Sequence, residues 1–156
     1  MTSYVVYDSQ FGNTRQLAQV IGDKLATAGA VQVIPTAEST PVPADVDLLI
    51  IGGPTHAHGA SAGMKALLNA LGSGSLEGVP AAAFDTRFHI ARWLSGSAAG
   101  VIAKRLRKAG CELVMPPESF FVSRDEEPVL LSGEFDRARS WARAVLAAVP
   151  SAVVKA

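Results

Sequence analysis

Short apolar runs rich in valine and isoleucine alternate along this chain with longer stretches in which apolar residues recur every three or four positions. The first pattern is typical of buried strands and the second of amphipathic helices, so the alternation predicts an α/β fold. We expect helices at residues 13–28, 64–71, 97–108 and 134–149. We expect strands at residues 4–8, 31–35, 46–53, 79–84 and 111–115, the last resuming at 120–122 beyond two prolines.

The run VDLLIIGG, residues 46–53, is apolar throughout, as a strand covered on both faces would be. Parallel strands joined through helices make right-handed crossovers, which place helices on both faces of one sheet. The pattern therefore predicts a three-layer αβα sandwich around a five-stranded parallel sheet, with residues 46–53 at its centre. The 156 residues suffice for one domain, which we place at 1–150, followed by a tail at 151–156.

Each long helix has an apolar face that we expect to pack on the sheet. Trp93 is expected to anchor its loop to the sheet, and Cys111 to be a small buried hydrophobe. The predicted helix faces comprise Leu17, Val20, Ile21, Lys24 and Leu25; Ala98, Val101, Ile102 and Leu106; and Phe135, Ala138, Trp141, Ala142 and Val145.

Composition argues against several classes of function. Fourteen Lys and Arg balance fourteen Asp and Glu, so we expect no broad basic surface for nucleic acid or an anionic membrane. A basic cluster at 104–108 has helical spacing and is expected to be a solvated helix face. No apolar stretch reaches the roughly 20 residues that span a bilayer. A single cysteine and the lack of signal-peptide features favour a cytoplasmic protein.

The segment SQFGNT, residues 9–14, follows the first strand directly. Ligands of open parallel sheets bind beyond the carboxyl ends of strands, where this segment lies. Free backbone amides at the start of the next helix, with the hydroxyls of Ser9 and Thr14 and the amide of Asn13, suit a phosphate, and Gly12 lets the backbone approach it. The alternative is a helix N-cap, in which Asn13 or Thr14 caps its own helix and nothing is bound. The segment alone favours neither alternative.

Rival phosphate-binding patterns are absent. The fingerprints GxxxxGK[ST] and GxGxxG do not occur, and the loop contains no lysine. Binding by amides and hydroxyls alone suits the phosphate of a permanently bound monoester better than a phosphoryl group that is being transferred. A phospho-acceptor signalling domain would need clustered carboxylates at its strand ends, whereas the third strand here ends in GGPT.

Two further loops complete the pattern. GGPTHAHGAS, residues 52–61, follows the third strand, and FDTRF, residues 84–88, ends the fourth. Together with SQFGNT these loops resemble those of the flavodoxin family, and the resemblance covers the chain from Tyr4 to about Val149. It implies the short-chain form with strand order 2-1-3-4-5 and a bound FMN, whose phosphate is held by the first loop and whose ring is held by the other two.

The resemblance also implies a role for each matching residue. The residues implied to hold the phosphate are Ser9, Gln10, Phe11, Gly12, Asn13 and Thr14. Those implied to border the flavin ring are Pro54, Thr55, His56 and Ala57 on one side, and Thr86, Arg87 and Phe88 on the other. No general base or nucleophile is implied, because the chemistry belongs to the flavin.

Some of these side chains have alternative roles. Phe88 is either an aromatic plate against the ring or a plug in the core. His56 and His58 have the spacing of metal ligands, but with no third ligand evident they are expected to form a turn. Asp85 is expected to brace Arg87. The positive charge of Arg87 near the ring would make the potential for full reduction of FMN less negative than in acidic relatives.

Three functions remain in view. We favour a one-electron carrier that takes electrons from a flavin reductase-type donor and passes them to a redox acceptor protein, and the resemblance implies a monomer. The alternative is an FMN-dependent NAD(P)H:quinone-type oxidoreductase, although the chain is short for the inserted loops that complete a substrate pocket. The third is a flavodoxin-like interaction module without cofactor. The presence of the phosphate-loop residues Ser9, Gly12 and Thr14 argues against this function.

Overall fold

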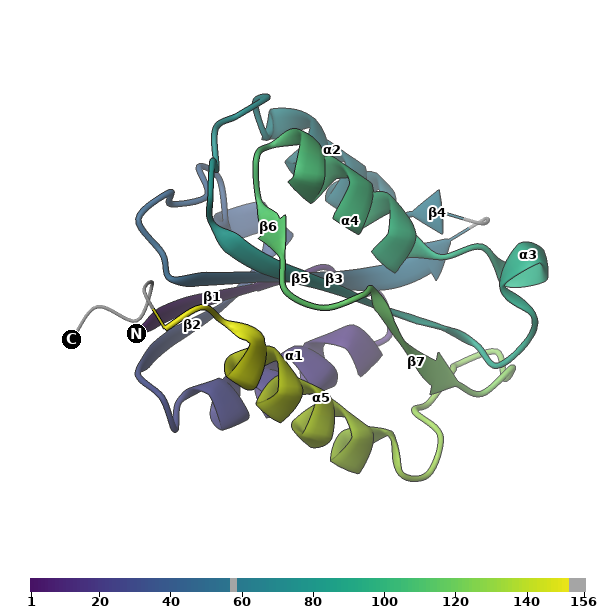
Figure 1. The fold of residues 1–156 in the computed structure, drawn as a ribbon. Coiled ribbons are helices and arrows are strands. Elements are labelled where there is room, and N and C mark those ends of the chain that lie inside the picture. The colour runs from purple at the N-terminus through teal and green to yellow at the C-terminus, as the bar shows by residue number, and fades with distance from the viewer. Residues whose placement is uncertain (57–58, 152–156) are drawn as a thin grey trace.

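A parallel sheet forms the middle layer of the molecule, which the computed structural model describes over residues 1–56 and 59–151 (Figure 1). The strand order is β2-β1-β3-β5-β6, and β7 pairs with β5 beyond the end of β6. The predicted order 2-1-3-4-5 is confirmed, because β5 is the fourth expected strand and β6 and β7 are the two parts of the fifth. The strands are β1 (Thr2–Tyr7), β2 (Ala30–Pro35), β3 (Leu48–His56), β5 (Pro80–Phe88), β6 (Glu112–Leu113) and β7 (Glu118–Val122).

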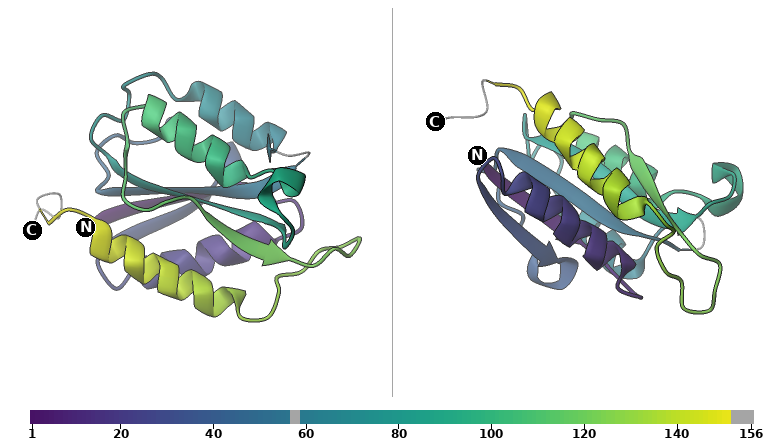
Figure 2. Two further views of the ribbon diagram at one scale, coloured as in Figure 1. Left: turned by 45° about the vertical axis from the view of Figure 1, so that its right-hand side comes forward. Right: turned by 90° about the horizontal axis from the view of Figure 1, so that it is seen from below.

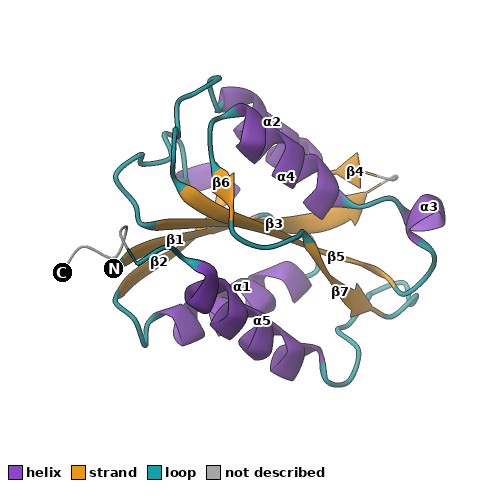
Figure 3. Ribbon diagram, in the orientation of Figure 1, coloured by secondary structure: helices purple, strands orange, loops and turns teal. Residues whose placement is uncertain are grey.

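Two pairs of helices cover the sheet, as the predicted three-layer arrangement requires (Figures 1 and 2). α2 (Ala62–Ala70) and α4 (Ala98–Lys108) lie on one face, and α1 (Asn13–Leu25) and α5 (Glu134–Ala148) on the other. Figure 3 also shows the short elements at the margins. These are η1 (Thr36–Glu38), α3 (Arg92–Ser95) and β4 (Gly59–Ala60), which pairs antiparallel with β3 and was not predicted.

The central strand β3 contributes side chains to both hydrophobic layers. Leu49 and Ile51 pack on the side of α2 and α4, whereas Leu48 and Ile50 pack on the side of α1 and α5. All four are completely buried, which confirms that the unbroken apolar run is covered on both faces.

Element boundaries differ from expectation where tertiary contacts extend or end an element. β5 continues four residues beyond the predicted end at position 84, because it pairs with β7 as far as Phe88. α2 begins two residues before the predicted position, because Ser61 caps it by accepting a hydrogen bond from the Met64 amide. α1 ends at Leu25 instead of residue 28.

Two predicted inward side chains are exposed. Val101 lies beside the buried stripe of α4 and is 38% exposed. Phe135 is also 38% exposed, because the buried stripe of α5 begins one residue earlier, at Glu134, whose carboxylate accepts a hydrogen bond from the Phe121 amide. Cys111 is buried as predicted. Between residues 1 and 56 and between 59 and 151, no helix has the length and apolar character needed to cross a membrane.

Candidate functional site

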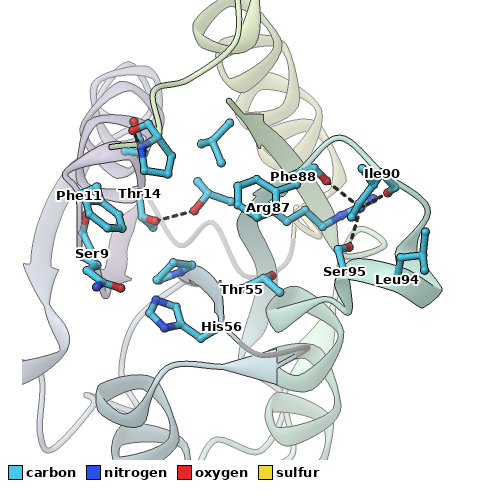
Figure 4. A pocket seen from close by; sticks show the side chains of 16 residues that line it. Ser9, Phe11, Thr14, Thr55, His56, Arg87, Phe88, Ile90, Leu94 and Ser95 are labelled. Carbon is cyan, nitrogen blue, oxygen red and sulfur yellow. Dashed lines mark hydrogen bonds between the residues drawn. The ribbon is translucent and has the colours of Figure 1, made fainter. Parts of the chain in front are cut away.

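The carboxyl ends of β1, β3 and β5 lie at one end of the sheet, and the loops that follow them enclose a cavity of about 410 Å³ (Figure 4). Eleven of the thirteen residues predicted to bind a cofactor line it. Gly12 lies in the loop backbone but is not among the lining residues, and Ala57 falls outside the described residues. The lining residues from the prediction are Ser9, Gln10, Phe11, Asn13, Thr14, Pro54, Thr55, His56, Thr86, Arg87 and Phe88.

The start of α1 is open toward a ligand. Gly12 occupies the N-cap position with φ 88° and ψ −9°, and within the described chain no side chain caps the first turn. Serine side chains cap α2 and α4 instead. The alternative in which Asn13 or Thr14 caps its own helix is therefore wrong, and the first amides of α1 remain free to bind an anion.

A comparison with α5 supports an anion at this position. The N-cap of α5, Gly133, has nearly the same conformation, with φ 86° and ψ −8°, and also lacks a side-chain cap. α5 has acidic residues in its first turn, Glu134 and Asp136, which complement the positive end of the helix dipole. α1 has no acidic residue in its first turn, so its dipole is left for a negatively charged group from outside the helix.

Hydroxyl groups surround the free amides. The Gly12 amide donates to Oγ of Ser9 at 3.1 Å, which leaves the Ser9 hydroxyl proton for another acceptor. The hydroxyls of Thr14 and Thr86 form a buried hydrogen bond of 3.1 Å that joins the first loop to the end of β5. Figure 4 draws this bond as the dashed line that starts at Thr14. The site thus combines backbone amides with neutral hydroxyls, which suits a phosphate monoester.

Exposed aromatic rings also border the cavity. Phe11 is 52% exposed and Phe88 is 38% exposed, and Figure 4 shows them on opposite sides of the cavity, with the Phe88 ring directed inward. Phe88 is therefore not a plug in the hydrophobic core. His56 also lines the cavity. Within the described residues no three His, Cys, Asp or Glu side chains are grouped to hold a metal ion, and His58 lies outside them.

Arg87 is held away from the middle of the cavity. Its guanidinium donates to Oγ of Ser119 at 2.9 Å, the carbonyl of Ile90 at 2.8 Å and Oγ of Ser95 at 3.1 Å. Figure 4 shows the side chain running from β5 toward Ile90 and Ser95. Arg87 therefore supports the loop after β5, and its charge is shared among these acceptors instead of facing the cavity directly.

Asp85 does not brace Arg87 as predicted, because its side chain lies on the α4 side of the sheet. Its Oδ2 accepts hydrogen bonds from the Thr55 hydroxyl at 3.2 Å, the Ser97 hydroxyl at 2.7 Å and the Ala99 amide at 2.9 Å. Thr55 in turn accepts from the Ala98 amide at 3.0 Å. The buried carboxylate thus ties the loop after β3 to the start of α4 and so shapes one wall of the cavity.

Five lining residues were missed, namely Ile90, Leu94, Ser95, Val122 and Pro128. The first three belong to the loop after β5 and to α3, which has only four residues and no helical periodicity to reveal it. Pro128 belongs to a segment that we call the strap, residues 123–131, which turns back along β7. Trp93 on α3 is 82% exposed, so the expectation that it anchors its loop is wrong.

The parallel sheet, the two helical layers and the cavity at the carboxyl ends of β1, β3 and β5 define the flavodoxin fold. No protein-family model and no curated protein matches the sequence. Several solved structures have the same fold as this chain.

Flavodoxin 2 from Bacillus cereus has a TM-score of 0.79 and 20% identity, covering 94% of this chain and 99% of that chain. A flavodoxin from the domain Archaea has a TM-score of 0.70 and 21% identity, covering 96% of this chain and 99% of that chain. Rubredoxin oxygen:oxidoreductase from Desulfovibrio gigas has a TM-score of 0.75 and 17% identity, covering 99% of this chain but 37% of that chain. At these identities the likeness establishes the fold.

Proposed function

We propose that the protein binds FMN in this cavity and carries electrons. The observation that carries the proposal is that one cavity joins the uncapped start of α1 to the exposed faces of Phe11 and Phe88. FMN has the same two parts, a dianionic phosphate and a flat aromatic ring. Similarity to the fold of proteins described as flavodoxins supports the same assignment.

The residues present fit FMN. Ser9, Thr14 and the backbone amides at the start of α1 would hold the phosphate, because they offer hydrogen-bond donors and the positive end of a helix dipole. Phe88 and His56 would contact the ring from β5 and β3. FMN supplies the electron chemistry when bound, and the chain binds it, orients it and limits its contact with water.

The rigid surroundings would keep the ring in one orientation. Asp85 links the wall formed by Thr55 to the start of α4, and Arg87 holds the loop that carries Ile90 and Ser95. Each tie joins protein groups to one another, so it does not need the ligand as a partner. Walls held in this way lower the entropy lost on association.

The proposed partners are those that the flavodoxin resemblance of the sequence implies. We propose that a flavin reductase-type protein donates electrons, that a redox protein accepts them, and that the carrier works as a cytoplasmic monomer. The neutral net charge predicts that docking depends less on salt than docking between strongly charged proteins.

The proposal is tested by titrating the purified protein, stripped of any flavin, with FMN and with riboflavin. We expect FMN to bind more tightly, because riboflavin lacks the phosphate, and we expect anaerobic reduction of the complex to proceed in one-electron steps. A protein that binds neither flavin would instead be an interaction module. Steady NAD(P)H oxidation with a quinone and no added reductase would favour the oxidoreductase.

A further inference from the structure

The strap, residues 123–131, is a hairpin that continues from β7 at the mouth of the cavity. The Ser123 amide donates to the Val129 carbonyl at 2.8 Å, and the Leu131 amide donates to the Phe121 carbonyl at 3.0 Å. Val122, the last residue of β7 before the strap, lines the cavity wall, and the returning arm of the strap contributes Pro128. Figures 1 and 2 show the strap at the end of the sheet where α3 and β4 also lie.

The side chain of Asn13 ties the strap to α1. Nδ2 of Asn13 donates a hydrogen bond of 2.7 Å to the carbonyl of Pro128, across a separation of 115 residues. Asn13 is only 8% exposed, so this bond is shielded from competing water. An asparagine amide has two donor protons, and the Pro128 carbonyl takes one of them.

The strap also reaches the opposite side of the cavity. The guanidinium carbon of Arg124 lies 5.9 Å from the centre of the Phe88 ring, at the outer limit of a cation–π contact. The strap therefore touches both the phosphate-loop side, through Asn13, and the ring side, through Phe88. Its acidic tip, residues 125–127, is exposed to solvent, whereas Pro128 lines the cavity.

We infer that Asn13 is a positioning residue that latches the strap across the cavity, and that the strap is a fourth ligand-binding segment that slows release of bound flavin. The inference rests on the proposed function. It assigns Asn13 a role different from the phosphate donor implied by the loop pattern, and the two roles predict different selectivity. Loss of a hydrogen-bond donor to the phosphate speeds release only of ligands that carry a phosphate. Loss of a latch speeds release of every ligand beneath the strap.

The test compares the wild type with Asn13→Ala, using Gln16→Ala as the control, because Gln16 is exposed on the same helix and does not line the cavity. Dissociation rates of FMN and of riboflavin are measured by stopped-flow fluorescence. We expect Asn13→Ala to speed both by the same factor of roughly two to ten, as loss of one hydrogen bond implies. Arg124→Ala, which loosens the weaker tie, should speed both by a smaller common factor.

A second measurement needs no flavin. Amide hydrogen exchange in the ligand-free protein should become faster in residues 123–131 of Asn13→Ala, while the core strands keep their protection. Faster release of FMN alone, with unchanged exchange in the strap, would overturn the latch and make Asn13 a phosphate donor. If the wild type binds neither flavin, the proposed function fails, while the exchange result still decides whether Asn13 holds the strap.

Discussion

At the scale of the residue, Gly12 determines how the first turn of α1 faces the cavity. Its φ of 88° lies in the left-handed region, where a side chain is strained even though an added Cβ would meet no atom closer than 4.0 Å. The glycine is therefore needed for its conformation and not for space. This conformation leaves the following amides pointing outward, so the backbone itself is part of the candidate site.

We predict that Gly12→Ala weakens FMN binding more than riboflavin binding, and that it lowers the free energy of unfolding by about 1 kcal/mol. The matched control is Gly78→Ala, which has a φ of 74°, no atom within 4 Å of an added Cβ, and a position before β5 at the far end of the sheet. The control should lose similar stability without losing flavin affinity. Equal losses for FMN and riboflavin in Gly12→Ala would contradict a phosphate at this loop.

The hydrogen bond between Thr14 and Thr86 is the second feature at this scale. Both hydroxyls are buried, and each is the other's only hydrogen-bond partner among the described residues. We predict that Thr14→Val and Thr86→Val each destabilise the protein by about 1 kcal/mol, because each leaves a buried hydroxyl without its partner. In urea denaturation the double variant should lose less than the sum of the two, and strict additivity would show that the pair does not interact.

At the scale of the element, Glu134 and Arg137 attach the start of α5 to β7. Glu134 is buried and accepts hydrogen bonds from the Phe121 amide at 2.7 Å and from Arg137 at 2.8 Å. The hydrogen bond that Arg137 donates to the Glu134 carboxylate raises the pKa of Arg137 above its ordinary value. The Arg137 guanidinium also lies over the rings of Phe120 and Phe121, at 5.0 Å and 5.3 Å from their centres.

We predict that Arg137→Ala lowers the free energy of unfolding by about 1–3 kcal/mol, because it leaves the Glu134 carboxylate buried with fewer partners. The control is Arg139→Ala on the same helix, whose ion pair with Asp136 has the same spacing but is exposed. Exposed pairs contribute little, so the control should change stability by less than about 0.5 kcal/mol. Similar losses in the two variants, measured by thermal and urea unfolding, would contradict this account.

At the scale of the whole molecule, Cys111 makes stability depend on pH. Burial raises the pKa of its thiol from 9.0 to about 11. The unfolded chain therefore ionises first as the pH rises, and the folded state then binds more protons than the unfolded state. The stabilising contribution is complete below pH 9.0 and is lost as the pH rises toward about 11.

We predict that the free energy of unfolding falls more steeply between pH 9 and pH 11 in the wild type than in Cys111→Ala. Urea denaturation at several pH values across this window measures the difference. The variant retains the other groups that titrate there, so the two slopes differ only through the thiol. Parallel slopes would show that Cys111 ionises equally in the folded and unfolded states.

Much of the fold follows from patterns within short segments. The apolar run at residues 46–53 and the alternation of strand and helix are local signals, and they predicted the order of the elements and the three layers. The meeting of three loops at the cavity was predicted because the carboxyl ends of parallel strands lie at one edge of a sheet. The short elements α3 and β4 carry no such period and were missed.

The sequence by itself determined where the strands and helices lie and which loops meet, because hydrophobic period and glycine position act within a few residues. The tertiary structure alone decided which polar partner each side chain takes. Asp85 holds Thr55 and the start of α4 instead of Arg87, and Asn13 holds Pro128 from 115 positions away. These hydrogen-bond partners depend on the direction of each side chain and on distances across the fold. No local sequence pattern indicates either of them.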